Sequence, residues 1–286
     1  MAQQFIIMGR TSSVLPMFRE VIASPAYECW FSYGECIPEL RHDFLFWGAT
    51  KHALSMRNHR SELGLMSPGA NWLPSLPRDI LGRELHGGSF AEAMGIIGDD
   101  PGALRFKLSE MKHDLLPAGL YETHSLRSIL ESAPELSDAH VQWTSSDLDL
   151  DYEHRFFLSQ GEILTGSPYL VEGEVYHSSI SWKHFAEAHR YASEMARELD
   201  AVSPPSYVLD VAWDRGNSRW IVLEANRSWS SGLYGSDPFL AMKAIGESFQ
   251  KSAWDWVPDE VIESYAPTLE VAPDPDLATG LIRLGG

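Results

Sequence analysis

Two apolar segments in the C-terminal third of the sequence carry side chains that could bind a metal ion. Asp210 interrupts "YVLDVAW", and Glu224 and Asn226 close "RWIVLEAN". If residues 207–213 and 219–225 form a hairpin across "DRGNS", the five-residue loop makes opposed residue numbers sum to an even value, so the two acids and the amide share one face. Such oxygen donors suit Mg²⁺, which takes one or two carboxylates together with phosphate oxygens. The three residues therefore predict a magnesium site.

The same register also places Val222 on that face. A second interpretation of the two acids stays open. The acids could lie at a solvated strand edge and pair with Arg219 or Arg227. The pattern of these two segments alone favours neither interpretation.

The strongly acidic composition makes the position of each basic residue informative. Asp plus Glu number 40 against 22 Lys plus Arg, a formal net charge of -18. Such a surface repels nucleic acids and anionic membranes in its mean field, so neither is expected as a partner. A polyanionic ligand would need a local cluster of cations or a metal ion. In "ALRFKL" the apolar residues alternate, which predicts a half-buried strand with Arg105 and Lys107 on one face.

Hydropathy and cysteine content indicate a globular protein of the cytoplasm. No segment approaches the roughly 18 apolar residues that a bilayer span needs, and the apolar run in "MAQQFIIMGR" is too short for a signal peptide. Cys29 and Cys36 form neither a disulfide framework nor a zinc-binding pattern, and we expect buried thiols.

The elements that must position these residues fall into two lobes and a tail. "QQFIIMG" and "DFLFWG" are expected strands, each followed by a helical pattern, which predicts a small α/β lobe over residues 1–85. The Pro- and Gly-rich connector "MSPGANWLPSLPRDILGRELHGG" leads to a second lobe over 86–260. There "EHRFFLSQ", "EILTGSPYLVEG" and "EVYHSSISW" indicate antiparallel strands, and "SWKHFAEAHRYASEMARELD" an amphipathic helix. Residues 261–286 are an expected tail with a frayed terminus, and the fold class is α+β.

The order of these motifs over roughly residues 75–240 resembles the ATP-grasp superfamily. The series "RFKLSEMK", "EHRFFL", "SPYLVEG", "YVLDVA" and "VLEANRSWSSGLYGSDP" is similar, more narrowly, to a divergent clade named for one arginine and two lysines. The resemblance implies an ATP-grasp-like two-lobe fold with antiparallel sheets, preceded by the small α/β lobe. It also implies ATP and Mg²⁺ as cofactors.

The resemblance assigns the phosphate contacts to basic residues. Lys107 corresponds to the lysine on the α-phosphate and adenine side, and Lys112 to the second lysine beside the flap over the phosphates. Arg155 in "EHRFF" matches the γ-phosphate or acyl-phosphate arginine, with Glu153 beside it as a weaker candidate. Lys112 and Arg155 are the predicted catalytic residues. The flap sequence is "KHDLLPAG" instead of Lys-x-Phe-x-Gly, so the flap glycine is Gly119 or absent.

The resemblance also assigns the acids and the loop that follows them. Asp210, Glu224 and Asn226 match the magnesium ligands. The acidic run before Arg155 lies where relatives place the ribose-lining linker, and a solvated turn is the alternative there for Asp147 and Asp149. The loop after the metal strand would contact the substrate through Ser230, Ser231, Gly232 and Tyr234.

The activity that the resemblance implies is ATP-dependent ligation of a carboxylate to an amine. A substrate carboxylate attacks the γ-phosphate, and an amine then takes the acyl phosphate, so the expected partners are small-molecule, peptide or protein carboxylates and amines. The alternative is a non-catalytic ATP-binding assembly chaperone or interaction module, because the clade includes a eukaryotic assembly factor for translation initiation. A further set of cations could hold a substrate carboxylate or be ordinary surface charges: Arg57, His59, Arg60, Arg78 and Arg83.

Overall fold

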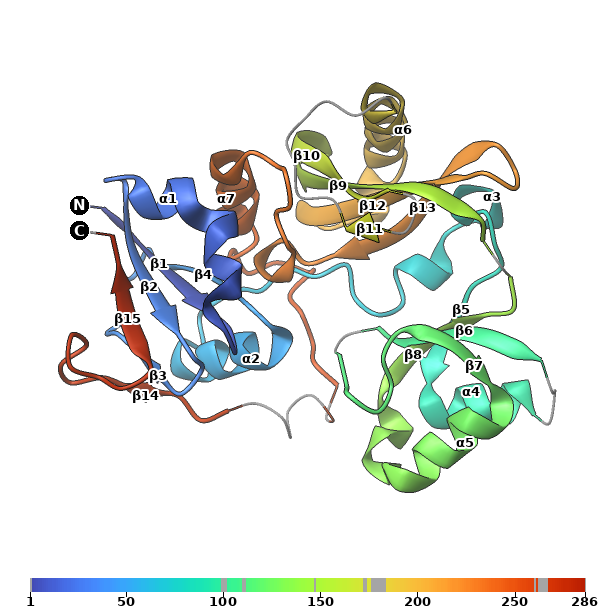
Figure 1. Ribbon diagram of the computed structural model, residues 1–286, viewed down its shortest axis with the longest axis horizontal. Coiled ribbons are helices and arrows are strands. Elements are labelled where there is room, and N and C mark those ends of the chain that lie inside the picture. Colours follow the sequence, from blue (N-terminus) through green and yellow to red (C-terminus); the bar gives the residue numbers. More distant parts are fainter. Residues whose placement is uncertain are drawn as a thin grey trace.

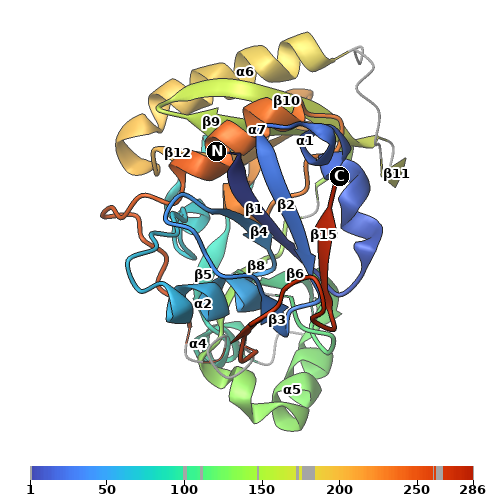
Figure 2. The same cartoon turned by 90° about the vertical axis from the view of Figure 1, so that its left-hand side faces the viewer.

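The first layer of the protein is a sheet built from both ends of the chain. A computed structural model describes residues 2–98, 102–109, 112–146, 148–171, 174–175, 184–259, 261 and 267–285. Strands β1 (Gln3–Met8), β2 (Tyr27–Ser32) and β4 (Leu45–Gly48) run parallel, and β15 (Leu281–Leu284) joins β2 antiparallel, in the order β15-β2-β1-β4 (Figures 1 and 2). The predicted frayed terminus is therefore wrong, because residues 281–284 form a strand.

Short helices and a second, two-stranded pairing complete this N-terminal layer. The apolar side chains of β1 are buried, as expected for a parallel strand covered on both faces. The covering elements are η1 (Ser12–Phe18), α1 (Arg19–Ala23) and α2 (Thr50–His59), and β3 (Cys36–Ile37) pairs with β14 (Glu270–Val271). The connector carries η2 (Leu73–Ser75) and α3 (Arg78–Leu81).

The small lobe is a four-stranded antiparallel sheet with helices on one face. Its strands are β5 (His86–Ser89), β6 (Ala103–Leu108), β7 (Gly119–Glu122) and β8 (His140–Thr144), in the order β5-β8-β6-β7. The helices are α4 (Phe90–Ile97), α5 (Thr123–Ser132) and η3 (Pro134–Asp138). Phe106 and Leu108 enter the core under these helices, whereas Arg105 and Lys107 alternate with them and point to the other face, as the sequence predicts.

The large lobe is a five-stranded sheet covered on both faces. The order β11-β10-β9-β12-β13 joins β9 (Leu150–Ser159), β10 (Glu162–Val171), β11 (Glu174–Val175), β12 (Ser206–Asp214) and β13 (Arg219–Asn226), all antiparallel. Helix α6 (Phe185–Glu198) covers one face, and the predicted apolar stripe through Ala188, Ala192 and Met195 lies in that core. The remaining expected strand residues, 176–182, lie outside the described residues.

Helix α7 (Pro238–Glu247) lies between the large sheet and the N-terminal layer (Figure 1). Its side chains Ala241 and Ile245 share one core with Phe5 of β1 and Phe157 of β9. The short helices η4 (Asp200–Val202) and η5 (Ser228–Ser230) complete the set. In the part of the chain that the structure describes, no helix is long and apolar enough to cross a membrane. The division at residues 85 and 260 stays a prediction.

His154 of β9 makes the fold sensitive to acid. Its ring is fully buried against Phe156, Phe185 and Trp220, and neither ring nitrogen has a hydrogen-bond partner among the described residues. Burial, with a smaller contribution from His184, lowers the pKa of His154 to about 4. The unfolded chain takes up this proton below about pH 6.5, whereas the folded chain stays neutral until about pH 4. Stability contributed by the neutral ring is therefore complete above pH 6.5 and is lost as the pH falls toward 4.

We expect His154→Phe to flatten the dependence of unfolding free energy on pH between 6.5 and 4, by up to roughly 3 kcal/mol. The replacement keeps an aromatic ring in an aromatic environment and removes the titrating group. Urea denaturation at several pH values measures this, and His124→Gln is the control because His124 is exposed. A slope unchanged by His154→Phe would contradict the assignment.

Candidate functional site

A β-bulge in β13 determines which side chains face one another. The β12–β13 loop is residues 215–218, shorter than the predicted five residues, and near it Val211 pairs with Val222. The register then shifts by one residue, so that Asp210 pairs with Glu224 and Leu223 has no residue opposite it. The prediction for Val222 is wrong, because Val222 packs in the α6-side core. The prediction that Asp210, Glu224 and Asn226 share a face is confirmed only because the bulge reverses the alternation.

The deepest part of the site is an ion pair between neighbouring strands. Arg155 of β9 lies opposite Asp210 of β12 and donates two hydrogen bonds to its carboxylate, Nε to Oδ1 at 2.9 Å and Nη2 to Oδ2 at 2.7 Å. The two side chains are 9% and 0% exposed. Burial disfavours the charged guanidinium, but the Asp210 carboxylate outweighs burial and raises the pKa of Arg155. The bidentate geometry fits the planar guanidinium, which lysine could not replace.

Asn226 and Glu224 extend this pair toward the small lobe. The Asn226 Nδ2 donates to Asp210 Oδ2 at 3.2 Å and to Glu224 Oε1 at 2.6 Å. Lys107 of β6 then donates to the other oxygen of Glu224 across the gap between the lobes. Burial alone would raise the pKa of Glu224, but the Lys107 ammonium and the bonds from Lys107 and Asn226 lower it to about 2. We refer to Lys107, Glu224, Asn226, Asp210 and Arg155 as the interlobe row.

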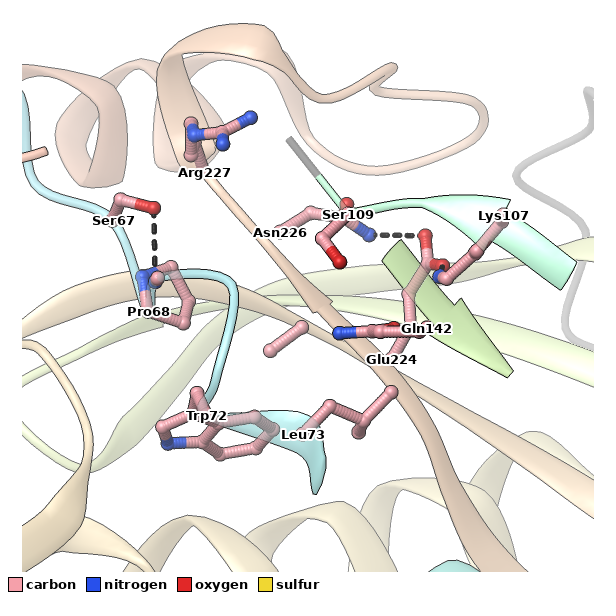
Figure 3. Close-up of a pocket in the computed structure, with 12 residues that line it drawn as sticks. Ser67, Pro68, Trp72, Leu73, Lys107, Ser109, Gln142, Glu224, Asn226 and Arg227 are labelled. Carbon is pink, nitrogen blue, oxygen red and sulfur yellow. Dashed lines mark hydrogen bonds and ion pairs between the residues drawn. The ribbon is translucent and has the colours of Figure 1, made fainter. Parts of the chain in front are cut away.

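A pocket opens beside the Lys107 end of the interlobe row. Its walls come from the connector, the small-lobe sheet and β13, as Figure 3 shows for Trp72, Gln142 and Glu224. Lys107 and Asn226 also line it. The pocket thus exposes both a cation and the carboxylate and amide of β13 to a ligand that enters between the lobes.

Two tyrosines enclose the other end of the row. The Arg155 guanidinium lies 5.1 Å from the ring centre of Tyr169 and 5.2 Å from that of Tyr234, and the two rings stack on each other. Tyr169 donates its hydroxyl to Glu153, whose pKa is raised chiefly by burial. Tyr234 has a left-handed φ of 50°, which costs energy for a residue other than glycine. Sequence reasoning missed Tyr169, although it lies in the quoted segment "SPYLVEG".

The chemistry of the row fits a divalent cation that prefers oxygen. Among the described residues, no three His, Cys, Asp or Glu side chains form a metal-binding group, so any site here depends on the amide of Asn226 as well. The positive end of that amide lies between the two carboxylates. Assignment of amide oxygen and nitrogen follows the hydrogen bonds, and a rotated amide would present its oxygen to a bound cation. Two carboxylates and an amide oxygen match the ligands of Mg²⁺.

The other predicted residues have separate positions. Lys112 is exposed, and Asp147 lies outside the described residues. Asp149 forms an exposed ion pair with Arg215 beside the β12–β13 loop, as the solvated-turn alternative predicts. Gly119 begins β7 and pairs with Phe106.

The predicted substrate loop is held by the large lobe and the N-terminal layer. The Gly232 carbonyl accepts from Arg155 Nη1 at 3.4 Å, and the Ser231 carbonyl accepts from Trp47 Nε1 at 2.7 Å. Ser230 closes η5, and Tyr234 covers Arg155. These contacts place the loop at the Arg155 end of the row.

The cations of the N-terminal layer and connector mostly contact backbone carbonyls. Arg57 donates to Trp256 O at 2.6 Å, and His59 Nε2 lies 2.7 Å from Leu269 O. Arg60 pairs with Glu62 at the surface. Arg83 is buried and donates to carbonyls of β13, a position that no sequence signal other than the neighbouring Gly82 indicated.

Comparison with known proteins identifies the fold and then the family. Similar structures include D-cycloserine synthetase DcsG, 11% identical over 85% of this chain and 99% of that chain, with a TM-score of 0.52. D-alanyl-alanine synthetase A from Vibrio cholerae O1 biovar eltor str. N16961 is 10% identical over 86% and 98%, with a TM-score of 0.51. The D-alanine-D-alanine ligase from Coxiella burnetii is 10% identical over 92% and 96%, with a TM-score of 0.51. At these identities the likeness shows the fold alone, which is that of ATP-grasp ligases.

A match to a family model covers a shorter segment of the chain. Residues 116–244 match a family model described as an ATP-grasp domain, family 2 of the clade named for one arginine and two lysines. No curated protein matches the sequence significantly. Residues 116–244 therefore match an ATP-grasp domain of this clade, and the predicted resemblance and fold class are confirmed.

We expect Arg155→Met to lower the free energy of unfolding by about 3–5 kcal/mol, because it leaves the buried Asp210 carboxylate without its partner. Adding Asp210→Leu should recover much of the loss, since the double variant has no uncompensated buried charge. Urea denaturation measures both. Arg215→Met, which breaks the exposed pair with Asp149, is the matched control and should change little. Equal losses for the two arginine variants would contradict the assignment.

Proposed function

We propose that the protein is an ATP- and Mg²⁺-dependent ligase that joins a carboxylate to an amine through an acyl phosphate. The observation that carries this proposal is the interlobe row, in which a lysine of the small lobe meets a carboxylate and an amide of the large lobe beside a pocket. Phosphoryl transfer to a carboxylate gathers several negative charges, so cations must be positioned around them. The names of the three similar structures, two synthetases and a ligase, support the same reaction class.

Each residue of the row has a role in this reaction. Asp210, Glu224 and the Asn226 amide oxygen would hold Mg²⁺, which supplies charge neutralisation to the phosphates when bound. Lys107 would bind phosphate oxygens on the small-lobe side, and Arg155 holds the Asp210 carboxylate in place. A substrate carboxylate oxygen bonds to the γ-phosphorus as the bond to ADP breaks. The amine nitrogen then bonds to the acyl carbon, phosphate leaves, and the amine gives up a proton.

A second candidate function, a non-catalytic nucleotide-binding module, has its own supporting observation. The Arg155 guanidinium is enclosed by Asp210, the Gly232 carbonyl and two tyrosine rings. Arg155 stabilises the fold by pairing with the buried Asp210. A protein that binds ATP without catalysis would therefore also need this arginine. Lys107 and Glu224 remain accessible, with side chains 31% and 29% exposed, and they would bind nucleotide in either case.

The expected compartment is the cytoplasm. Cys29 and Cys36 are free thiols, as is usual in a reducing compartment, and ATP is available there. The expected acyl and amine substrates are small molecules, peptides or proteins.

Release of ADP separates ligase from module. Purified protein with Mg²⁺ and ATP, offered pools of amino acids and peptides, should release ADP above the substrate-free background if it is a ligase. Tight nucleotide binding without release over broad pools would instead favour the module. No nucleotide binding at all would contradict both.

We expect Glu224→Gln and Lys107→Met to weaken binding of Mg²⁺ with a non-hydrolysable ATP analogue by about 10–100-fold. Glu224→Gln removes a metal-binding charge, so its effect should disappear when EDTA replaces Mg²⁺, whereas the Lys107→Met effect should remain. Isothermal titration calorimetry measures both. Lys243→Met is the matched control, since Lys243 is exposed on α7. Wild-type affinity in both site variants would contradict the proposed phosphate and metal contacts.

A further inference from the structure

Arg83 is a buried cation in the connector whose hydrogen bonds, among the described residues, go to backbone carbonyls. The residue is 6% exposed and follows Gly82, which ends α3 with a left-handed φ of 71°. Its Nη1 donates to the Leu81 carbonyl at 2.8 Å and to the Val222 carbonyl at 3.4 Å, and its Nη2 donates to the Leu223 carbonyl at 2.9 Å. One guanidinium therefore joins the connector to two consecutive residues of β13.

The two β13 carbonyls can share one guanidinium only because the strand is irregular there. In a regular strand, consecutive carbonyls point toward opposite edges. Val222 and Leu223 are the residues at the register shift, and Leu223 has no partner on β12. Among the described residues β13 is the edge strand of the sheet, so no further strand there donates hydrogen bonds to these carbonyls. Arg83 supplies the donors that the bulge lacks.

The connector packs directly against β13 at the turn that carries Gly82 and Arg83. A Cβ atom on Gly82 would lie 2.7 Å from Cγ2 of Ile221, so a side chain there would push α3 away from the strand. Ile80 and Leu81 of α3 are buried in the same core as Val222. The position of Arg83 relative to the bulge is therefore fixed by packing on both sides of it.

The direction of the metal-binding side chains depends on this bulge. Without the register shift, the pairing of Val211 with Val222 would continue along the strand and place Glu224 opposite Leu209. Leu209 belongs to the core under α6, so Glu224 and Asn226 would point into an apolar layer and away from Asp210. A slip of one residue would thus remove two of the three predicted ligands from the site.

We propose that Arg83 is a positioning residue that holds the β13 bulge and thereby aims Glu224 and Asn226 at Asp210 for cation binding. The part that concerns cation binding rests on the proposed nucleotide and magnesium site. The part that concerns the bulge is a statement about the fold and can be tested without any ligand. Arg83 touches neither substrate nor phosphate in this account and acts through the strand.

The experiment compares Arg83→Met and Arg83→Lys with Arg219→Met. Arg219 also joins β13 to the α3 region, through the Asp79 carbonyl at 3.4 Å, but lies away from the bulge and serves as the matched control. The first readout is the affinity for a non-hydrolysable ATP analogue with Mg²⁺ divided by that with EDTA. We expect this ratio to fall by about 10-fold or more in Arg83→Met, the range typical for residues that orient metal ligands. Arg83→Lys should lower the affinity ratio to a similar extent, because an ammonium cannot bond to both carbonyls as the planar guanidinium does.

The second readout is amide hydrogen exchange of residues 222–226 by NMR without ligand. We expect faster exchange there in both Arg83 variants and unchanged exchange in Arg219→Met. An Arg83→Met protein that is merely less stable, with the wild-type affinity ratio and wild-type exchange at 222–226, would overturn the proposal. If wild-type protein binds no nucleotide, the proposed function fails, and the exchange experiment still decides whether Arg83 holds the bulge. If Arg83→Met does not fold, Arg83→Lys supplies both readouts.

Discussion

The site depends on the neutralisation of Asp210, a carboxylate with no exposure to solvent. Burying such a charge is unfavourable unless a partner compensates it, and Arg155 does so with two hydrogen bonds from the neighbouring strand. The remainder of the row follows from this pair, because Asn226 bonds to Asp210 and Glu224, and Glu224 bonds to Lys107 of the other lobe. The row therefore runs from the core of the large sheet to a pocket between the lobes, with the neutral Asn226 amide between two carboxylates that are each paired with a cation. Arg155 and Asp210 lie inside the large lobe, whereas Lys107, Glu224 and Asn226 line the pocket.

This division of the row bears on how function is inferred from sequence motifs. Arg155, which the sequence matches to the arginine of the clade's name, pairs here with a buried carboxylate, so this motif does not by itself indicate catalysis. The accessible end, Lys107 with Glu224, is stronger support for nucleotide binding, since an interlobe ion pair beside a pocket can exchange its partners for phosphate and metal.

Much of the fold could be predicted from the sequence, because period and order are local properties. The alternation in "ALRFKL" correctly placed Arg105 and Lys107, and the stripe through Ala188 and Met195 correctly predicted α6. The hairpin was predicted with the wrong loop length. The bulge at Leu223 cancels that error for Glu224 and Asn226, but not for Val222, which lies on the loop side of the bulge and faces the other way. A bulge held by a distant arginine, and a C-terminal strand that pairs with β2, are long-range features that no local pattern encodes. The order of motifs, by contrast, indicated the ATP-grasp family correctly.

The most direct test of the central claim is a crystal structure of the protein with Mg²⁺ and a non-hydrolysable ATP analogue. We expect a metal ion bound by oxygens of Asp210, Glu224 and Asn226, with the Lys107 ammonium moved from Glu224 to a phosphate. Arg155 should remain paired with Asp210. A nucleotide bound elsewhere, or bound with the Lys107–Glu224 pair intact and no metal on β13, would contradict the account.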